Sequence, residues 1–246
     1  MLNLSNVQYF DDPWPHVVIP ELFSDLSVVK AMTNTQTLPN YLRAVDEFEP
    51  TRSELSADQI DDMQDFPDEI SAGLRALDNS QDLLAILEQH LLPKLKEAYP
   101  DKPDSYWSDF NKYVFKYGGY SPITKKEDVG IELKGTHIDG GAKIYTGMVY
   151  FREAMDHDEK ANFYLEKYDT SGKKVEEKYF RYGNNVAIFW ANLPECWHRA
   201  EARGTTGTAT RRFINFVANG KEPLHDYRAI NSKGQKAYGW KEVHKL

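Results

Sequence analysis

The residues Thr136-His137-Ile138-Asp139 place a histidine and a carboxylate two positions apart. In an extended strand, residues two apart project to the same side, so both side chains can reach one metal ion. An imidazole nitrogen with a carboxylate oxygen suits Fe(II), which non-haem enzymes hold with two histidines and one carboxylate. Gly140-Gly141 follows at once and lets the chain turn away from the ion. The alternative is a surface turn with a hydrogen-bonded His–Asp pair.

We expect the third ligand to be His198, 61 residues after His137. It follows an apolar run (186–192) and a short turn, and it opens the next strand-like run. In a jelly roll, residues placed in this way can return to the barrel mouth that holds the first pair. The other histidines lie in an N-terminal strand, a leucine-rich helix, an acidic turn and the C-terminal tail: His16, His90, His157, His225 and His244.

An anionic cosubstrate that chelates such an ion needs a counter-charge, and arginine provides a bidentate one. Arg211 comes thirteen residues after His198, and Arg212 follows it, at the start of a β-prone run. Alternation along the strand sends one of them inward and the other outward. We favour Arg211, because Asn215 would then lie on the same inner face. For either arginine, the alternative is a surface salt bridge.

The bulk composition narrows the class of protein. The chain has 246 residues, 41% hydrophobic residues and a formal net charge of −8, which permits a buried core and argues against a nucleic-acid binder. Its single cysteine, Cys196, excludes an intramolecular disulfide and fits a reducing compartment. The N-terminus lacks the features of a signal peptide, and no run is long and apolar enough to span a membrane. We therefore expect a cytoplasmic location.

The chain changes character near residue 105. Residues 1–105 read as a mixed, largely helical support region, with a proline-bounded strand, a helix start at Ser24-Asp25 and a leucine-rich helix that Asn79 or Ser80 can cap. Pro93 should bend or break that helix. Residues 106–220 hold about eight β-rich runs separated by turn residues, which is typical of an antiparallel sandwich or jelly roll.

Residues 221–246 form a polar tail that Tyr227, Tyr238 and Trp240 could anchor. We expect one compact domain overall, mainly β with flanking helices and a double-stranded β-helix (jelly-roll) core.

From 113 to 219, the chain resembles the Fe(II)/2-oxoglutarate-dependent dioxygenases, and within them the prolyl hydroxylase-like branch. The motifs that carry the resemblance fall in order: FKYGG, His137-Ile138-Asp139, YTGMVYFRE, YGNNVAIFWANLPECWHRAE and ATRRFINFV. The resemblance implies that the three ligands hold Fe(II), with 2-oxoglutarate and O2 as cosubstrates and ascorbate as an optional addition.

Carried over to this sequence, the resemblance implies further roles. Arg211 would hold the 5-carboxylate of 2-oxoglutarate, Tyr150 would donate a hydrogen bond to it, and Tyr117 would line the same pocket. The sequence departs from the branch in its long gap between His198 and Arg211. It also ends the last run in Val217-Ala218-Asn219, where the branch often has a tryptophan. The second departure weakens the case for proline as substrate but not the case for an oxygenase.

The resemblance implies hydroxylation of a C–H bond, with peptidyl proline as the first choice of substrate and a free amino acid or small metabolite as the second. The acidic segment 46–69 and the loop 120–135 are the candidates for substrate contact. Two other classes of protein stay open: a cupin-like jelly roll that binds a metal or ligand without oxygenase activity, and a β-sandwich that binds peptide or sugar.

Overall fold

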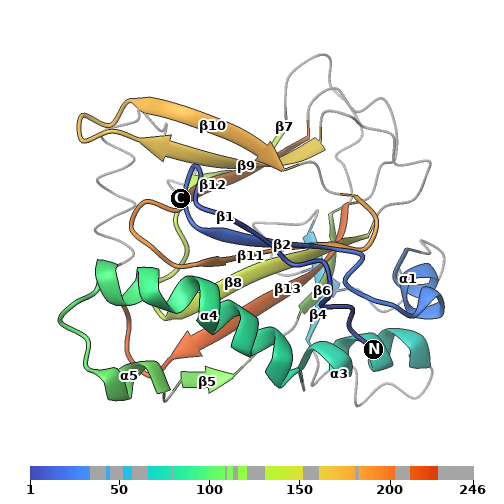
Figure 1. The fold of residues 1–246 in the computed structure, drawn as a ribbon. Helices are drawn as coiled ribbons and strands as arrows, with labels where there is room; N and C mark the ends of the chain where they lie inside the picture. The colour runs from blue at the N-terminus through green and yellow to red at the C-terminus, as the bar shows by residue number, and fades with distance from the viewer. Residues whose placement is uncertain are drawn as a thin grey trace.

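The computed structural model describes residues 1–33, 43–44, 52–56, 66–78, 80–108, 110–112, 116–120, 131–151, 161–180, 183–202 and 211–226. Within these residues, the strands form two antiparallel sheets (Figure 1). The small sheet has the order β10 (Lys174–Phe180), β9 (Ala161–Tyr168), β12 (Trp197–Ala202), β7 (Ile131–His137). The large sheet has the order β1 (Gln8–Phe10), β2 (His16–Pro20), β11 (Val186–Ala191), β8 (Lys143–Phe151), β13 (Arg211–Gly220), β6 (Lys116–Tyr120), β4 (Arg52–Ser56), β3 (Arg43–Ala44), with β5 (Phe110–Lys112) beside β13.

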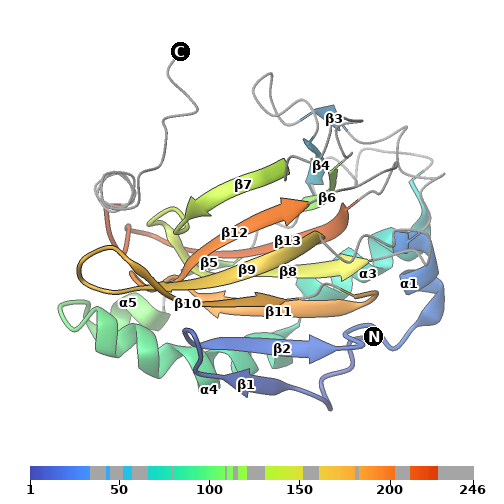
Figure 2. The same cartoon turned by 90° about the horizontal axis from the view of Figure 1, so that it is seen from above.

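The strands from β6 to β13 make up a jelly roll. Strands β6, β8, β11 and β13 belong to the large sheet, whereas β7, β9, β10 and β12 belong to the small one, so the chain passes repeatedly from one sheet to the other. Figure 2 looks down on the small sheet, with β8 and β13 of the large sheet behind it. The predicted fold class, mainly β with a double-stranded β-helix core, is confirmed.

The helices flank this core. They are α1 (Leu26–Thr33), α3 (Asp68–Asp78), α4 (Gln81–Ala98) and α5 (Asp104–Ser108). Helix α4 lies along the face of the large sheet that is turned away from the small sheet (Figure 1). Ser80 caps α4 as predicted, because its Oγ accepts a hydrogen bond from the Leu83 N–H at 3.1 Å.

Pro93 does not end α4, contrary to one of the two outcomes expected for it. The helix continues to Ala98, and Leu91 and Leu95 on either side of the proline are fully buried. Packing of these leucines against the sheet outweighs the hydrogen bond that proline removes.

The predicted division at residue 105 reflects a change in amino-acid composition. The large sheet nevertheless contains strands from both sides of that residue. In particular, β2 pairs with β11 along five residues. The aromatic residues expected to anchor the tail (Tyr227, Tyr238 and Trp240) lie outside the described residues. Within the described part of the chain, none of the helices has the length and apolar character needed to cross a membrane.

The two faces of β8 serve different purposes. The Tyr150 ring lies 6.1 Å from the Phe180 ring of the small sheet, so Tyr150, Met148 and Thr146 belong to the face between the sheets. The alternate residues face the helices. Gly147 is among them, and the Phe189 ring of β11 fills the space beside it.

Replacing Gly147 with alanine should destabilise the fold. An added Cβ would lie 2.1 Å from Phe189 Cδ1 and 3.0 Å from the Ile188 carbonyl oxygen, in a core that cannot relax freely. We expect a loss of about 2 kcal/mol or more in the free energy of unfolding, measured by denaturant titration. Gly140→Ala is the matched control, because its Cβ would meet nothing within 4 Å. Equal stabilities of the two variants would contradict this description of the core.

Candidate metal centre

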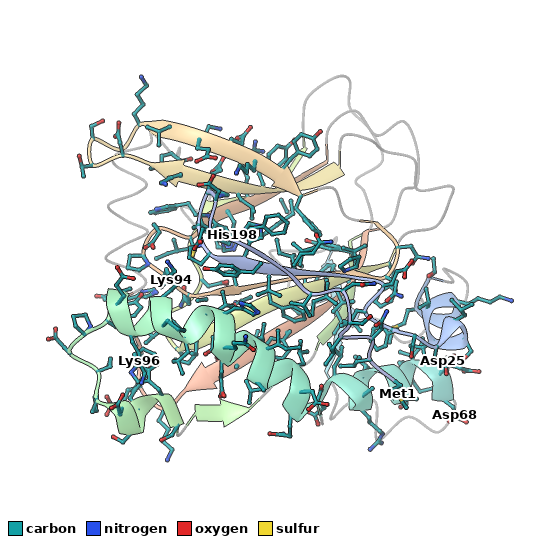
Figure 3. All side chains as sticks on the ribbon, in the orientation of Figure 1. Met1, Asp25, Asp68, Lys94, Lys96 and His198 are labelled. Carbon is teal, nitrogen blue, oxygen red and sulfur yellow. The ribbon has the colours of Figure 1, made fainter. Side chains whose placement is uncertain are left out.

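The three predicted ligands meet at one end of the small sheet. His137 is the last residue of β7, and it pairs directly with His198 on β12. The sequence predicts Asp139 in the same strand as His137, but in the structure it lies just beyond the end of β7. Ligand atoms of the three residues lie within 4.8 Å of one another, and His198 Nε2 is 3.8 Å from Asp139 Oδ2. Figure 3 shows His198 between the two sheets.

His198 is buried, and its orientation is fixed. Its Nδ1 lies 2.9 Å from the Cys196 carbonyl oxygen. An N–H at Nδ1 donates to that carbonyl and leaves the Nε2 lone pair toward Asp139, which is the usual arrangement for a metal-binding histidine. The ring also packs against Trp190, with 5.1 Å between centroids, and against Phe163, with 5.4 Å.

Asp139 is a buried carboxylate with two different partners. Oδ1 accepts a hydrogen bond from Lys143 Nζ at 2.5 Å, and Oδ2 accepts one from Trp190 Nε1 at 3.2 Å. Burial acts to raise the pKa of Asp139, but the Lys143 ammonium, aided by the adjacent imidazoles, outweighs it and holds the pKa well below its usual range. The side chain is therefore ionised and ready to bind a cation.

The glycines after Asp139 allow a close turn. The Asn192 amide donates to the Gly140 carbonyl at 2.9 Å, and the Leu224 N–H donates to the Gly141 carbonyl at 2.7 Å. A Cβ at Gly141 would lie 2.0 Å from the carbonyl oxygen of His225, so only glycine fits there without a shift of the backbone. The predicted role of these glycines in turning the chain is consistent with this packing.

A second buried carboxylate, Glu166 on β9, joins the strands that carry the histidines. Glu166 is 1% exposed. It accepts hydrogen bonds from Thr136 Oγ1 at 2.7 Å and from Arg199 Nε at 2.8 Å, and these two residues are direct chain neighbours of the histidine ligands. Tyr168 at 2.9 Å and Lys174 at 3.3 Å complete the network. The network braces β7 and β12 from the outer face of the small sheet.

Some of the predicted cosubstrate residues lie between the sheets. Tyr150 is fully buried, and its hydroxyl donates to Met148 Sδ at 3.1 Å. Phe213 pairs with Tyr150, and the half-buried Asn215 pairs with Met148, so both lie on the inner face of the large sheet.

For Tyr117, Arg211 and Arg212 the structure describes the backbone register but not the side chains. Position 211 is two residues before Phe213 in the strand, so both positions lie on the same, inner face. Position 212 belongs to the opposite face. Tyr117 pairs with Ile214, which also places position 117 on that opposite face and does not favour a pocket role for it.

Three residues near the ligands were missed by the sequence reasoning: Lys143, Trp190 and Asn192. Lys143 follows Asp139 by four residues, a spacing visible in the sequence that has meaning only once the intervening turn is known. Trp190 and Asn192 come from β11 and the residues just after it, and nothing local in the sequence links them to Asp139. His225, set aside as a tail residue, stacks on Tyr99 at 6.3 Å behind the same turn.

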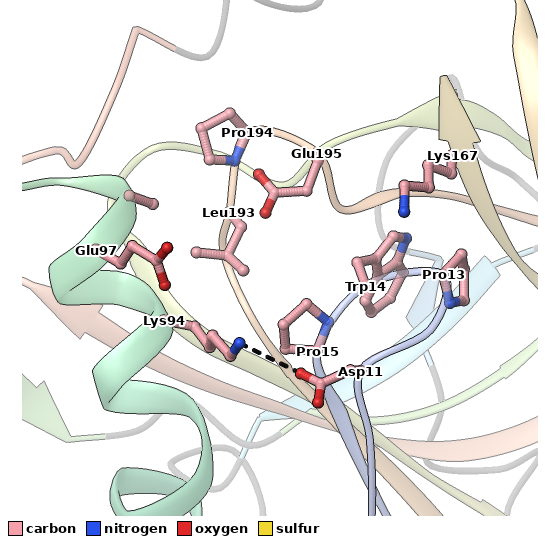
Figure 4. Close-up of a pocket in the computed structure, with 11 residues that line it drawn as sticks. Asp11, Pro13, Trp14, Pro15, Lys94, Glu97, Lys167, Leu193, Pro194 and Glu195 are labelled. Carbon is pink, nitrogen blue, oxygen red and sulfur yellow. Dashed lines mark ion pairs between the residues drawn. The ribbon is translucent and has the colours of Figure 1, made fainter. Parts of the chain in front are cut away.

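A separate cavity of about 570 Å³ opens beside the segment that leads to His198 (Figure 4). Its lining includes Trp14, Lys167 and Glu195, and an ion pair of 3.4 Å between Lys94 and Asp11. Burial raises the pKa of the Glu195 carboxyl. The lining contains none of the three candidate ligands, so this cavity is not the metal site.

No family model matches the sequence, and no curated protein sequence matches it either. Solved structures do match. A prolyl 4-hydroxylase from Phytophthora capsici has a TM-score of 0.51 at 16% identity over 84% of this chain, which spans 59% of the length of that enzyme. A prolyl-4-hydroxylase from Pseudomonas putida has a TM-score of 0.51 at 10% identity, with 84% of this chain and 93% of that chain covered.

A prolyl hydroxylase from Trichoplax adhaerens, solved with a peptide of hypoxia inducible factor, has a TM-score of 0.51 at 11% identity, with 89% and 86% of the two chains covered. The chain has the fold of the prolyl hydroxylases. At these identities the prolyl hydroxylase likeness is one of fold, and what the protein does has to be argued from its site.

Replacing Glu166 with alanine should loosen the ligand-bearing strands. Arg199 and Thr136 would lose a buried partner, and we expect a loss of about 3 kcal/mol in the free energy of unfolding, measured by denaturant titration. Glu176→Ala is the control, because the ion pair that Glu176 makes within the described part of the chain is a surface one, with Lys178 at 3.4 Å, and its loss should cost less than about 1 kcal/mol. A loss no larger than that of the control would show that the network does not brace the sheet.

Proposed function

We propose that this protein is an Fe(II)- and 2-oxoglutarate-dependent dioxygenase that hydroxylates a C–H bond. The observation that carries the proposal is the meeting of His137, Asp139 and His198, from separate segments, within 4.8 Å of one another. Two histidines and one carboxylate make up the donor set that non-haem iron oxygenases use. The jelly-roll fold shared with prolyl hydroxylases supports the same chemistry.

The residues present fit an iron ion and an oxo acid. The carboxylate is ionised, and His198 presents Nε2 to it. Thr146 lies on the inner face, opposite Trp190 in the register, and its buried Oγ1 has no hydrogen-bond partner within the described residues. A polar ligand between the sheets would satisfy that hydroxyl.

The chain's own residues would bind, orient and enclose the reactants. Arg211, on an inner-face position, would pair with the far carboxylate of 2-oxoglutarate, and Tyr150 would donate its hydroxyl hydrogen to the same cosubstrate in place of Met148 Sδ. Asn215 offers a further polar group on that face. The buried rings of Trp190 and Phe163 exclude water beside the ligands. When bound, iron with 2-oxoglutarate and O2 supplies the oxidising power that converts C–H to C–OH, with release of succinate and CO2.

For the substrate, we favour peptidyl proline, because three of the matching structures are prolyl hydroxylases and one of these holds a peptide. A free amino acid or small metabolite is the second choice. The segments 46–69 and 120–135, expected to contact substrate, lie mostly outside the described residues. Mass-spectrometric detection of one added oxygen atom on peptides or amino acids distinguishes the two. A requirement for ascorbate and a cytoplasmic location stay predictions.

The wild-type protein should consume 2-oxoglutarate and form succinate in an Fe(II)- and O2-dependent manner, slowly even without a primary substrate. His198→Ala should reduce this turnover to background, because the ion loses one of three protein ligands. Succinate measured by mass spectrometry is the readout. His90→Ala, on α4, is the matched control and should keep full turnover. Metal binding without any 2-oxoglutarate consumption would instead favour a cupin-like binding protein.

The two adjacent arginines should respond differently to removal. Arg211→Ala should raise the KM for 2-oxoglutarate by roughly a hundredfold, because a charge-assisted bidentate pair is worth about 3 kcal/mol. Arg212→Ala, at a position on the opposite face of β13, should leave this KM within about twofold, since its guanidinium would make no contact with the cosubstrate. Steady-state kinetics of succinate formation measures both. The reverse result would assign the cosubstrate to Arg212.

A further inference from the structure

Lys143 lies directly against Asp139, one of the three candidate ligands. Its ammonium lies 2.5 Å from Oδ1 of the carboxylate, whereas Oδ2 is the oxygen that faces His198 Nε2 at 3.8 Å. The two carboxylate oxygens are therefore not equivalent. Oδ1 is bound by the Lys143 ammonium, whereas Oδ2 faces the candidate ligand His198.

The turn between Asp139 and Lys143 is held rigidly. Asn192 Nδ2 donates to the carbonyls of both Gly140 and Lys143, at 2.9 Å and 3.0 Å. The carbonyls between them accept hydrogen bonds from the N–H groups of Leu224 at 2.7 Å and Gly220 at 2.8 Å. Every carbonyl from 140 to 143 thus has a partner from outside the turn, which fixes the start of the lysine side chain relative to the carboxylate.

We propose that Lys143 is a positioning residue that makes Asp139 a one-oxygen ligand. This inference rests on the proposed function. A carboxylate can bind a metal through one oxygen or both. By holding Oδ1, Lys143 leaves only Oδ2 for the ion, and a six-coordinate ion then keeps three positions open. Those three positions are what a bidentate oxo acid and O2 require.

The charge of Lys143 should also affect the affinities for the metal and for the oxo acid, in opposite directions. A positive charge beside the carboxylate opposes binding of a divalent cation, while it favours binding of a dianion to the loaded site. Loss of the ammonium should therefore tighten metal binding and weaken binding of the oxo acid. A residue that merely supported the structure would, when removed, weaken both.

The test compares full-length wild-type protein with Lys143→Met, which keeps the length of the side chain and removes its charge. In anaerobic titrations, Mn(II) affinity measured by calorimetry should rise on the order of tenfold in Lys143→Met. The affinity of the Fe(II)-loaded protein for 2-oxoglutarate, followed by the charge-transfer absorption of the chelate, should fall by a similar factor. Lys143→Arg keeps the cation and should restore both affinities to near the wild-type values.

Lys96→Met is the matched control, since it removes another lysine paired with an aspartate, Asp104 at 2.7 Å, on the distant α4. Both affinities should be unchanged in it. Weaker binding of both ligands by Lys143→Met, or no change in either, would overturn the role of Lys143. A wild-type protein that binds Mn(II) but forms no chelate with 2-oxoglutarate would instead refute the proposed function, and the Mn(II) comparison would still test the control of Asp139.

Discussion

The site depends on keeping the Asp139 charge in the interior of the protein. A carboxylate that is 5% exposed loses its hydration and is tolerated only when other groups replace the water. Here an ammonium, an indole N–H and two imidazoles surround it. Because these groups come from β8, β11, β7 and β12, they can surround the carboxylate only when both sheets are assembled. A metal centre built in this way would link metal binding to the integrity of the jelly roll.

A second buried carboxylate, Glu166, lies on the outer face of the small sheet and is also surrounded by hydrogen-bond donors. Glu166 is as deeply buried as Asp139, and it also replaces water with a cation and hydroxyl donors. Its partners are the residues next to His137 and His198 in the chain, so each histidine strand has an inner side chain that can bind metal and an outer one that ties it to β9. Alternation along a strand makes this division automatic. The two histidines are thereby held at a fixed separation before any ion arrives.

The sequence was informative where the signal is local. Alternating apolar residues and turn glycines between 106 and 220 predicted the strands, and the apolar run before His198 indicated that this histidine opens a strand. The sequence could not decide whether Arg211 or Arg212 lies on the inner face of β13. The pairing of Phe213 with Tyr150 assigns position 211 to the inner face and position 212 to the opposite one. Lys143, Trp190 and Asn192 could not be assigned, because their meaning depends on contacts between β11 and a turn that lies 47 to 53 residues earlier, between 139 and 143. At Pro93 the local signal for the end of a helix was strong, but the packing of the neighbouring leucines keeps α4 continuous.

A shared fold at 10 to 16% identity does not establish the chemistry of this protein, because the fold positions the strands and individual side chains make the site. In this jelly roll, the pairing of β7 with β12 brings positions 137 and 198 opposite each other, and the sequence places a histidine at each. Whether the pair becomes an oxygenase centre depends on side chains that the fold does not require. Under the proposed function, an ionised carboxylate would face the pair with one oxygen only, and an arginine on the inner face would bind the far carboxylate of the oxo acid. Lys143 lies against Oδ1 of Asp139 and leaves Oδ2 facing His198, so the proposed one-oxygen coordination of this carboxylate would meet the first demand.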